Sequence, residues 1–174
     1  MGVLKSIQTN HFAYREKKGK KLNDGYKMYW FFDIHGTVLK PNYQAGNTPK
    51  DYYPYAEETL KFLSTINDIT MVLFTCSHPH EIQEYINLFA KSSIKFTFIN
   101  ENPEVQTEMA PKLDTEGNIM FDAKGKQIFE PNGYGCYDKK PYMNVLFEDK
   151  SGFDPEIEWK EVLEFMKAKY GSTT

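Results

Sequence analysis

Four short apolar runs, each followed by polar side chains, constrain the fold of this chain more than any other feature. They span residues 27–32, 69–74, 94–99 and 144–147. Because the runs are apolar almost throughout, without alternation of polar and apolar residues, they predict strands that are buried on both faces. Strands of this kind are typical of parallel sheets that helices cover on both sides.

Segments with helical spacing lie between and after these runs. Apolar residues recur at helical spacing from Tyr55 to Ile66, and a second helix is expected to begin at Pro79. A last helix is expected from Asp154, as its N-cap, and Pro155. The alternation of strands and helices predicts right-handed crossovers between parallel strands. We therefore expect an α/β fold, a three-layer sandwich with a mostly parallel, Rossmann-like sheet.

Two segments depart from this alternation. The first 26 residues are polar, and we expect them to be irregular, with the lysines of residues 17–21 in a solvated loop rather than a phosphate-binding patch. Residues 100–138 contain no helical pattern but predict a hairpin, 118–121 with 127–129. We expect one domain, residues 1–174, without internal repeats, in which residues 100–138 form a small β-hairpin insertion resembling a lid.

Composition narrows the class of protein. Of the 174 residues 40% are hydrophobic and 26% charged, which is enough apolar surface for a folded core. The net charge of −3 does not favour nucleic acid as a partner, although it leaves it possible. No apolar run is long enough to span a membrane, and Cys76 and Cys136 are too few for a disulfide framework. We expect a cytoplasmic protein without a membrane partner.

Polar side chains that could take part in catalysis or binding follow three of the four apolar runs. Because the carboxyl ends of parallel strands meet at one edge of the sheet, we expect these side chains to converge there, where ligands bind in open α/β folds. They are Asp33 and His35, Thr75 and Ser77, and Glu148 and Asp149.

These segments resemble, in order, the four motifs of the haloacid dehalogenase (HAD) superfamily. The stretch Asp33-Ile34-His35-Gly36-Thr37 is similar to the first motif, Asp-x-Asp-Gly-Thr, and Thr75-Cys76-Ser77 after an apolar run is similar to the second. Lys139-Lys140-Pro141 supplies the lysine of the third, and Glu148-Asp149 the acidic pair of the fourth. The resemblance extends from about residue 27 to 168 and implies a HAD-like fold.

The resemblance also implies a magnesium-dependent phosphatase, a hydrolase of phosphomonoesters that works through an aspartyl-phosphate. Asp33 would be the nucleophile and a Mg²⁺ ligand, the backbone carbonyl of His35 a second ligand, and Asp149 a third. Glu148 would support these ligands from beside them or bind the ion through water, or else pair with a lysine. Mg²⁺ is the cofactor that this chemistry requires, because a carboxylate must approach an anionic phosphate.

Two further roles follow from the resemblance. Thr75 would donate a hydrogen bond to the transferring phosphoryl group, and Lys140, or its neighbour Lys139, would neutralise the charge that gathers there. Ser77 is expected to cap the helix at Pro79 rather than to take part in catalysis. Cys76 is expected to be an inert buried thiol. The flanking histidines are expected to be surface residues of the helix; they are His78 and His80.

The chain departs from the family pattern at His35, which stands where phosphatases of the superfamily carry an acid/base aspartate. An imidazole has an ordinary pKa of about 6.5 and can protonate a leaving oxygen and deprotonate water near neutral pH. We predict that His35 is the general acid/base; the alternative is a structural histidine. The first two motifs are too close for a large cap domain. An open site would suit a bulky substrate, such as a nucleotide, a phosphoprotein or the phosphorylated end of a macromolecule, whereas a small lid would suit a small phosphate ester.

Three rival functions stay open at this stage. The first is a related phosphoryl-directed activity with slow hydrolysis, in which His35 restrains the attack of water. The second is a non-catalytic domain that senses phosphate or a metal. The third is the processing of nucleic-acid ends, which requires the lysines of residues 17–21 to lie near the site.

Overall fold

The computed structural model of this protein describes residues 2–42, 46–105, 110–130 and 141–171. The chain forms two compact units. Unit 1 comprises Met1–Asn100 and Met143–Thr174, and unit 2 comprises Glu101–Tyr142.

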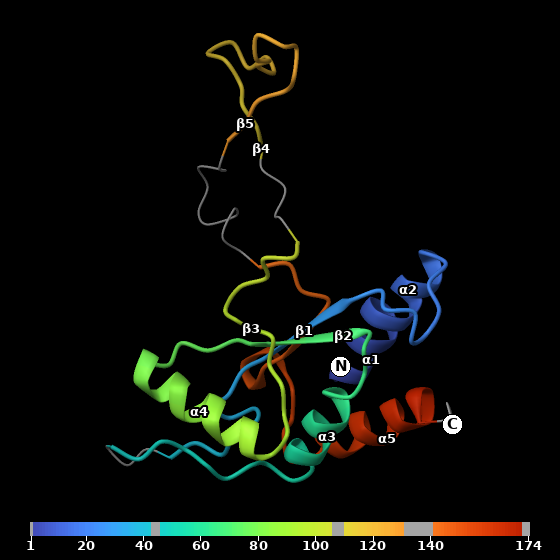
Figure 1. Cartoon of the computed structure of the whole chain (residues 1–174), viewed down its shortest axis with the longest axis vertical. Helices are drawn as coiled ribbons and strands as arrows, with labels where there is room; N and C mark the ends of the chain where they lie inside the picture. Colours follow the sequence, from blue (N-terminus) through green and yellow to red (C-terminus); the bar gives the residue numbers. More distant parts are fainter. Residues whose placement is uncertain (1, 43–45, 106–109, 131–140, 172–174) are drawn as a thin grey trace. The chain divides into compact units, whose positions relative to one another are not determined.

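Unit 1 is built on a parallel sheet of four strands in the order β3-β2-β1-β6 (Figure 1). The strands are β1 (Met28–Phe32), β2 (Ile69–Leu73), β3 (Phe98–Ile99) and β6 (Val145–Phe147). All neighbouring pairs are parallel, and Phe32 at the end of β1 stands in register with Leu73 and Phe147. The four strands expected from the apolar runs are confirmed, the third of them shorter than its run.

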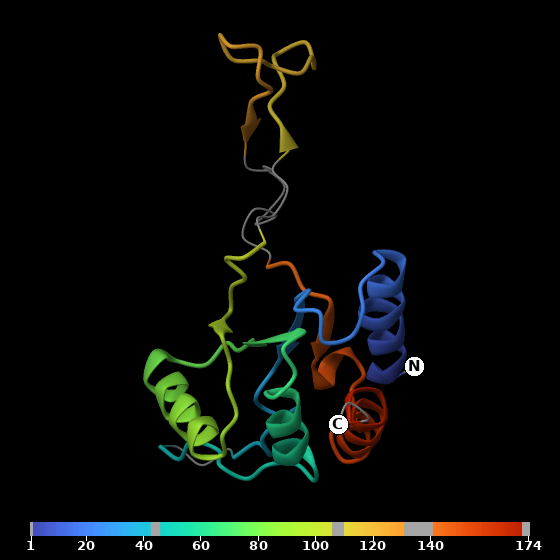
Figure 2. The ribbon, with the colours of Figure 1, turned by 45° about the vertical axis from the view of Figure 1, so that its right-hand side comes forward.

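Helices flank this sheet, which makes the fold α/β as predicted. They are α3 (Ala56–Leu63), α4 (Pro79–Lys91) and α5 (Glu158–Tyr170), with a helical segment at the amino terminus. Helices α3 and α5 pack side by side, whereas α4 packs against the segment that leads into β3, where Phe89 and Phe96 bring their ring centroids to 5.0 Å (Figure 2). Among the described residues, none of the helices combines the length and the apolar character that a membrane crossing needs.

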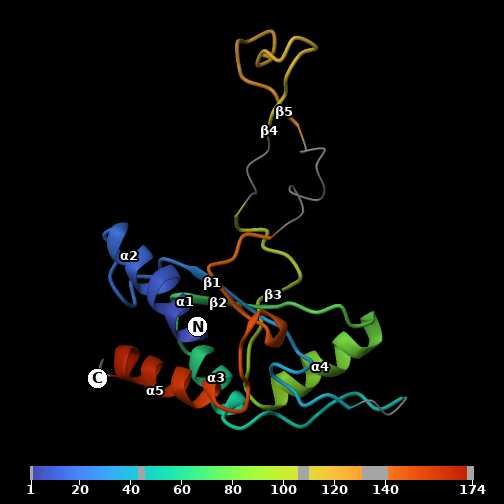
Figure 3. The same ribbon diagram turned by 180° about the vertical axis from the view of Figure 1, so that it is seen from behind.

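The amino-terminal segment is helical from Val3 to Lys17, so the expectation that the first 26 residues are irregular is wrong for this part and is confirmed for residues 18–26. Three helical stretches follow one another without a break: α1 (Val3–Ile7), a π-helical turn (Gln8–Ala13) and α2 (Tyr14–Lys17) (Figure 3). The side chains that they bury are four residues apart, and two of them are polar: Val3, Ile7, His11 and Arg15. A search for apolar periodicity misses this helix because half of its inward stripe is polar.

The last helix begins later than expected, at Glu158, so Asp154 is not its N-cap. The Asp154 carbonyl accepts the Glu158 N–H at 2.9 Å, and its side chain accepts the Glu156 N–H at 3.0 Å. These bonds close a turn before the helix. Asp and Pro favour such turns as much as they favour helix starts, which explains the error.

A stack of aromatic rings fixes the ends of β1 and β6. The ring centroids of Phe32 and Phe147 are 4.6 Å apart, and those of Phe147 and Trp159 are 5.2 Å apart. All three side chains are fully buried. This packing determines where the residues that follow the two strands, Asp33 and Glu148, leave the sheet.

Unit 2 contains the expected hairpin. An antiparallel bridge joins Phe121 to Gln127 around the turn at Gly125, which confirms that prediction. Two further short strands, β4 (Ala110–Pro111) and β5 (Phe129–Glu130), pair in antiparallel fashion.

Unit 2 also contains a short repeat, contrary to the expectation that the chain has none. The Asp114 side chain accepts the N–H groups of the residues two and four positions later, and Asp122 does the same in the next turn. Gly117 and Gly125, both with positive φ, hold the same place in the two turns. The repeat is only eight residues long and its turn chemistry is common, so the sequence pattern gives little warning of it.

Candidate functional site

Three carboxylates meet at the carboxyl edge of the sheet. Asp33 follows β1, and Glu148 and Asp149 follow β6; the Asp33 N–H donates to the Phe147 carbonyl at 3.0 Å, which continues the pairing of the two strands. One carboxylate oxygen from each residue lies within 4.8 Å of the others, and all three residues are half-buried. The structure therefore brings together the acidic residues that the sequence pattern selected.

The electrostatics of this cluster favour a cation. Burial raises the pKa of the Asp33 carboxyl; a hydrogen bond from the Ile34 backbone opposes this, and the charges of Glu148 and Asp149 raise it further. Among the described residues, Asp149 Oδ1 is a buried oxygen without a hydrogen-bond partner. Buried carboxylate oxygens normally have partners, so this oxygen fits a metal ligand.

The loop after β1 holds the carboxylate cluster in place through hydrogen bonds of Thr37. The Asp149 N–H donates to Thr37 Oγ1 at 3.0 Å, and the Thr37 hydroxyl lies 3.4 Å from Asp33 Oδ2. The Trp159 indole N–H donates to the Thr37 carbonyl at 2.8 Å. Thr37 thereby joins the ends of β1 and β6. In the sequence, only its place in the first motif indicates that it belongs to the site.

Gly36 lets Asp149 approach this loop closely. Its φ is +78°, a backbone conformation that residues other than glycine rarely adopt. A Cβ atom at this position would lie 2.8 Å from Asp149 Oδ2. A glycine at this position is therefore required by the carboxylate above it.

His35 is half-buried and contacts Tyr85 of α4, a residue that the sequence analysis did not single out. Its Nε2 lies 2.6 Å from the hydroxyl of Tyr85, which is fully buried in α4. Burial, followed by the charges of Glu81 and Glu84, raises the pKa of Tyr85 to about 12, so its hydroxyl stays protonated at neutral pH. Tyr85 therefore holds the imidazole in place.

Thr75 and Ser77 lie at the same edge of the sheet, after β2. Their hydroxyl oxygens are 2.8 Å apart, and the Ser77 N–H donates to Thr75 Oγ1 at 3.1 Å. The side chain of Asn100 accepts the Thr75 N–H and donates to its carbonyl, both at 2.7 Å. Asn100, which the sequence reasoning missed, therefore fixes the backbone of this loop.

Other expectations for this loop are corrected or confirmed. Ser77 does not cap α4; the N-cap is His78, whose N–H donates to the Glu81 carboxylate at 2.9 Å. Cys76 is exposed rather than buried, because the chain has left the sheet before reaching it. His78 and His80 are exposed, as predicted. Three residues named in the sequence analysis lie outside the described residues: Cys136, Lys139 and Lys140. The last two are the alternatives for the site lysine.

The lysines of residues 17–21 do not adjoin the carboxylates. They precede β1, and the N–H groups of Asn23 and Gly25 donate to Asp68, the residue before β2, at 2.7 and 3.2 Å. The lysine-bearing turn thus lies at the amino edge of the parallel sheet, whereas Asp33 follows its carboxyl edge.

Comparisons with known proteins bear on the fold. No family model matches this chain, and no curated protein matches it. A solved structure, that of a conserved protein from Bacteroides thetaiotaomicron, is similar with a TM-score of 0.52 and 17% sequence identity, over 82% of this chain and 92% of that one. At this identity the likeness shows the fold alone. The chain is an α/β protein with a parallel sheet between helices, the three-layer, Rossmann-like class that its sequence predicts.

Proposed function

We propose that this protein is a Mg²⁺-dependent phosphatase of the HAD type. The observation that carries the proposal is the cluster of Asp33, Glu148 and Asp149, with its raised Asp33 pKa and its unpartnered buried oxygen. These oxygens are the hard ligands that Mg²⁺ prefers, and the His35 carbonyl would add another. When bound, the ion would offset the repulsion between the carboxylates and an anionic phosphate.

The residues of this chain would carry out two displacements. In the first, an Asp33 carboxylate oxygen forms a bond to phosphorus while the ester bond breaks, and the leaving oxygen takes a proton from the His35 imidazole. In the second, His35 accepts a proton from water, whose oxygen attacks phosphorus and releases Asp33 and inorganic phosphate. Thr75 would hydrogen-bond a phosphoryl oxygen, and Lys140 would neutralise negative charge.

The substrate is a phosphorylated molecule, either a small ester, a nucleotide or a macromolecular end. End processing of nucleic acid loses its main support, because the lysine-bearing turn lies at the other edge of the sheet. We also infer a cytoplasmic setting, which the exposed thiol of Cys76 supports, since reducing compartments keep such thiols free.

Hydrolysis of an aryl phosphate with Mg²⁺ tests the proposal, with wild type, Asp33→Asn and His35→Ala side by side. We expect turnover that requires both Mg²⁺ and Asp33, and a loss of roughly 10²–10⁴-fold in His35→Ala. A flat pH–rate profile between about pH 5 and 8 would count against His35 as the acid/base.

A second candidate is a domain that binds metal or phosphate with slow or no turnover. Two observations favour it: His35 stands in place of a carboxylate, and the hydroxyls of Thr75 and Ser77 bond each other. Magnesium binding that depends on Asp33, without turnover on any phosphate ester, would support this candidate over the phosphatase.

A further inference from the structure

Positive charge is concentrated in one turn of unit 1. Residues 14–27 carry six cationic side chains and only two carboxylates, in a chain whose net charge is −3. Four of the cations are exposed lysines at the end of α2 and in the turn after it, here called the lysine turn: Lys17, Lys18, Lys20 and Lys21. A surface of this kind attracts polyanions.

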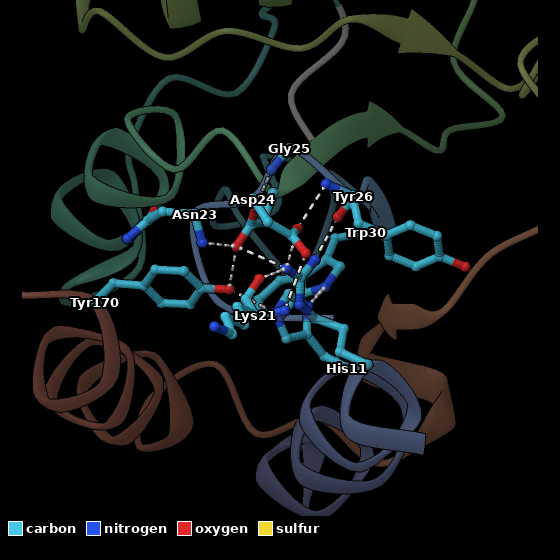
Figure 4. A network of polar contacts seen from close by, with 10 residues as sticks. His11, Lys21, Asn23, Asp24, Gly25, Tyr26, Trp30 and Tyr170 are labelled. Carbon is cyan, nitrogen blue, oxygen red and sulfur yellow. Dashed lines mark hydrogen bonds and ion pairs between the residues drawn. The ribbon is translucent and has the colours of Figure 1, made fainter. Parts of the chain in front are cut away.

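A buried arginine fixes the shape of the lysine turn. Arg15, whose side chain is 1% exposed, donates to the backbone carbonyls of Lys21 and Tyr26 and forms ion pairs with Asp24 at 2.8 Å and Asp68 at 3.2 Å. Figure 4 shows its partners Lys21, Asp24 and Tyr26 within this network. The guanidinium thus fixes the chain from Lys21, the last lysine of the turn, to Tyr26.

Two carboxylates complete this support. Asp68 is fully buried and accepts the N–H groups of Asn23 and Gly25, and Asp24 accepts those of Lys21 at 2.9 Å and Tyr26 at 2.9 Å. Burying an ion pair is costly unless hydrogen bonds satisfy it, and here those bonds are directed at the turn. A loop that merely carries lysines into water needs no such support, whereas a binding surface gains affinity when it is ordered in advance.

Aromatic rings lie among the lysines. The Lys18 Nζ is 5.7 Å from the centroid of the Tyr14 ring. The centroid of the Tyr26 ring lies 5.1 Å from the Lys20 Nζ and 5.8 Å from the Arg15 guanidinium carbon. Both tyrosines are half-buried and pack against the core. Leu22 is the large apolar side chain that the turn exposes, at 38%. Rings beside cations are the combination on which unpaired bases stack, whereas one leucine provides little surface for insertion into a membrane.

We propose that the lysine turn binds single-stranded nucleic acid, with the lysines on the phosphates and Tyr14 and Tyr26 against bases. The site lies at the amino edge of the sheet and is separate from the carboxylate cluster. It is therefore independent of the proposed phosphatase activity, and would anchor the protein on a strand rather than process its end.

The test measures fluorescence anisotropy of a labelled oligothymidylate of about 16 nucleotides with the full chain. If four phosphates are neutralised, the slope of log K against log salt is about −2.8, so affinity falls about 50-fold between about 50 and 200 mM NaCl. The variant in which all four lysines of the turn become glutamine should lose this slope and bind at least about 30-fold more weakly at the lower salt. Tyr26→Leu should weaken binding by about 5-fold or more.

A charge-matched variant controls for net charge: four exposed lysines elsewhere in unit 1 become glutamine, namely Lys50, Lys61, Lys91 and Lys95. It should bind within about threefold of wild type, and melting curves should show both variants folded. Equal losses in the two variants, no wild-type binding at the lower salt, or tighter binding to phosphatidylserine vesicles than to the oligonucleotide would each overturn the proposal. Asp33→Asn should bind the oligonucleotide like wild type, which separates this test from that of the phosphatase.

Discussion

At the scale of single residues, the crowding of three carboxylates works against the stability of the fold. Asp33 is half-buried beside two other carboxylates, and burial raises its pKa above the ordinary value. Because this pKa is higher in the folded than in the unfolded chain, the carboxyl destabilises the fold at pH values above its pKa in the unfolded chain. Unfavourable charge of this kind is common at functional sites.

Replacing Asp33 by Asn should therefore stabilise the protein in metal-free buffer at neutral pH, raising the melting temperature by roughly 2–4 °C. Adding Mg²⁺ should raise the melting temperature of wild type more than that of Asp33→Asn, because the variant lacks one of the three carboxylates that would hold the ion. Calorimetry without and with chelator measures both effects. Glu156→Gln, which removes an exposed carboxylate of the same unit, should leave the Mg²⁺ response intact; equal responses in wild type and Asp33→Asn would contradict the metal site.

At the scale of elements, a chain of buried hydrogen bonds attaches the amino-terminal helix to β1 and α5. The Trp30 indole N–H donates to His11 Nδ1 at 3.1 Å, and the Tyr170 hydroxyl donates to Asp68 at 3.1 Å. His11 Nε2 lies 2.8 Å from the Tyr170 hydroxyl oxygen. Because Nδ1 is an acceptor, the neutral ring carries its proton on Nε2 and donates it to Tyr170.

This network should make stability depend on pH through His11. Burial, and secondarily the charge of Arg15, lowers the pKa of His11 to about 3. As pH falls below about 6.5 the unfolded chain gains a proton that the folded chain excludes, so the free energy of unfolding should fall by up to about 1.4 kcal/mol per pH unit. Urea unfolding between about pH 4 and 6 should show this slope reduced in His11→Gln.

The comparison rests on the slope, so a general loss of stability in His11→Gln does not obscure it. The matched control is His78→Gln, which removes an exposed histidine and should keep the wild-type slope over this range. An unchanged slope in His11→Gln would show that His11 titrates normally in the folded protein.

At the scale of the whole molecule, the hydrophobic core belongs to unit 1. Among the described residues, none of those between Glu101 and Tyr142 contributes to the core cluster, and four large apolar side chains of unit 2 are about half exposed: Leu113, Ile119, Phe121 and Phe129. The two ends of unit 2 meet, since the Asn102 side-chain amide donates to the Tyr142 carbonyl at 2.8 Å.

Unit 1 should consequently fold without unit 2. Replacing residues 103–141 by a short Gly-Ser linker should leave one cooperative unfolding transition and the Mg²⁺-dependent rise in melting temperature. Turnover should fall by at least about 100-fold, because Lys140 is removed with the segment. An unfolded product would show that unit 2 is required for the core, and full activity would show that neither Lys139 nor Lys140 is the site lysine.

Local pattern in the sequence was sufficient for the sheet and for part of the candidate site. Continuous apolar runs identify strands buried on both faces, and parallel order alone brings the residues after those strands to one edge, which is why Asp33, Glu148 and Asp149 were predicted together. Helix boundaries were less accurate, as the start of α5 shows, because turns and helix caps use the same residue types.

The tertiary structure determined which polar side chains are buried and which residues of distant elements meet at the candidate site. His11 and Arg15 are buried because partners far along the chain, Tyr170 and Asp68, satisfy their polar groups. Thr37 and Tyr85 became site residues in the same way, through contacts across elements. Periodicity reflects only apolar side chains that are close together in the sequence. A buried polar side chain, in contrast, is stable only with partners that the fold brings to it.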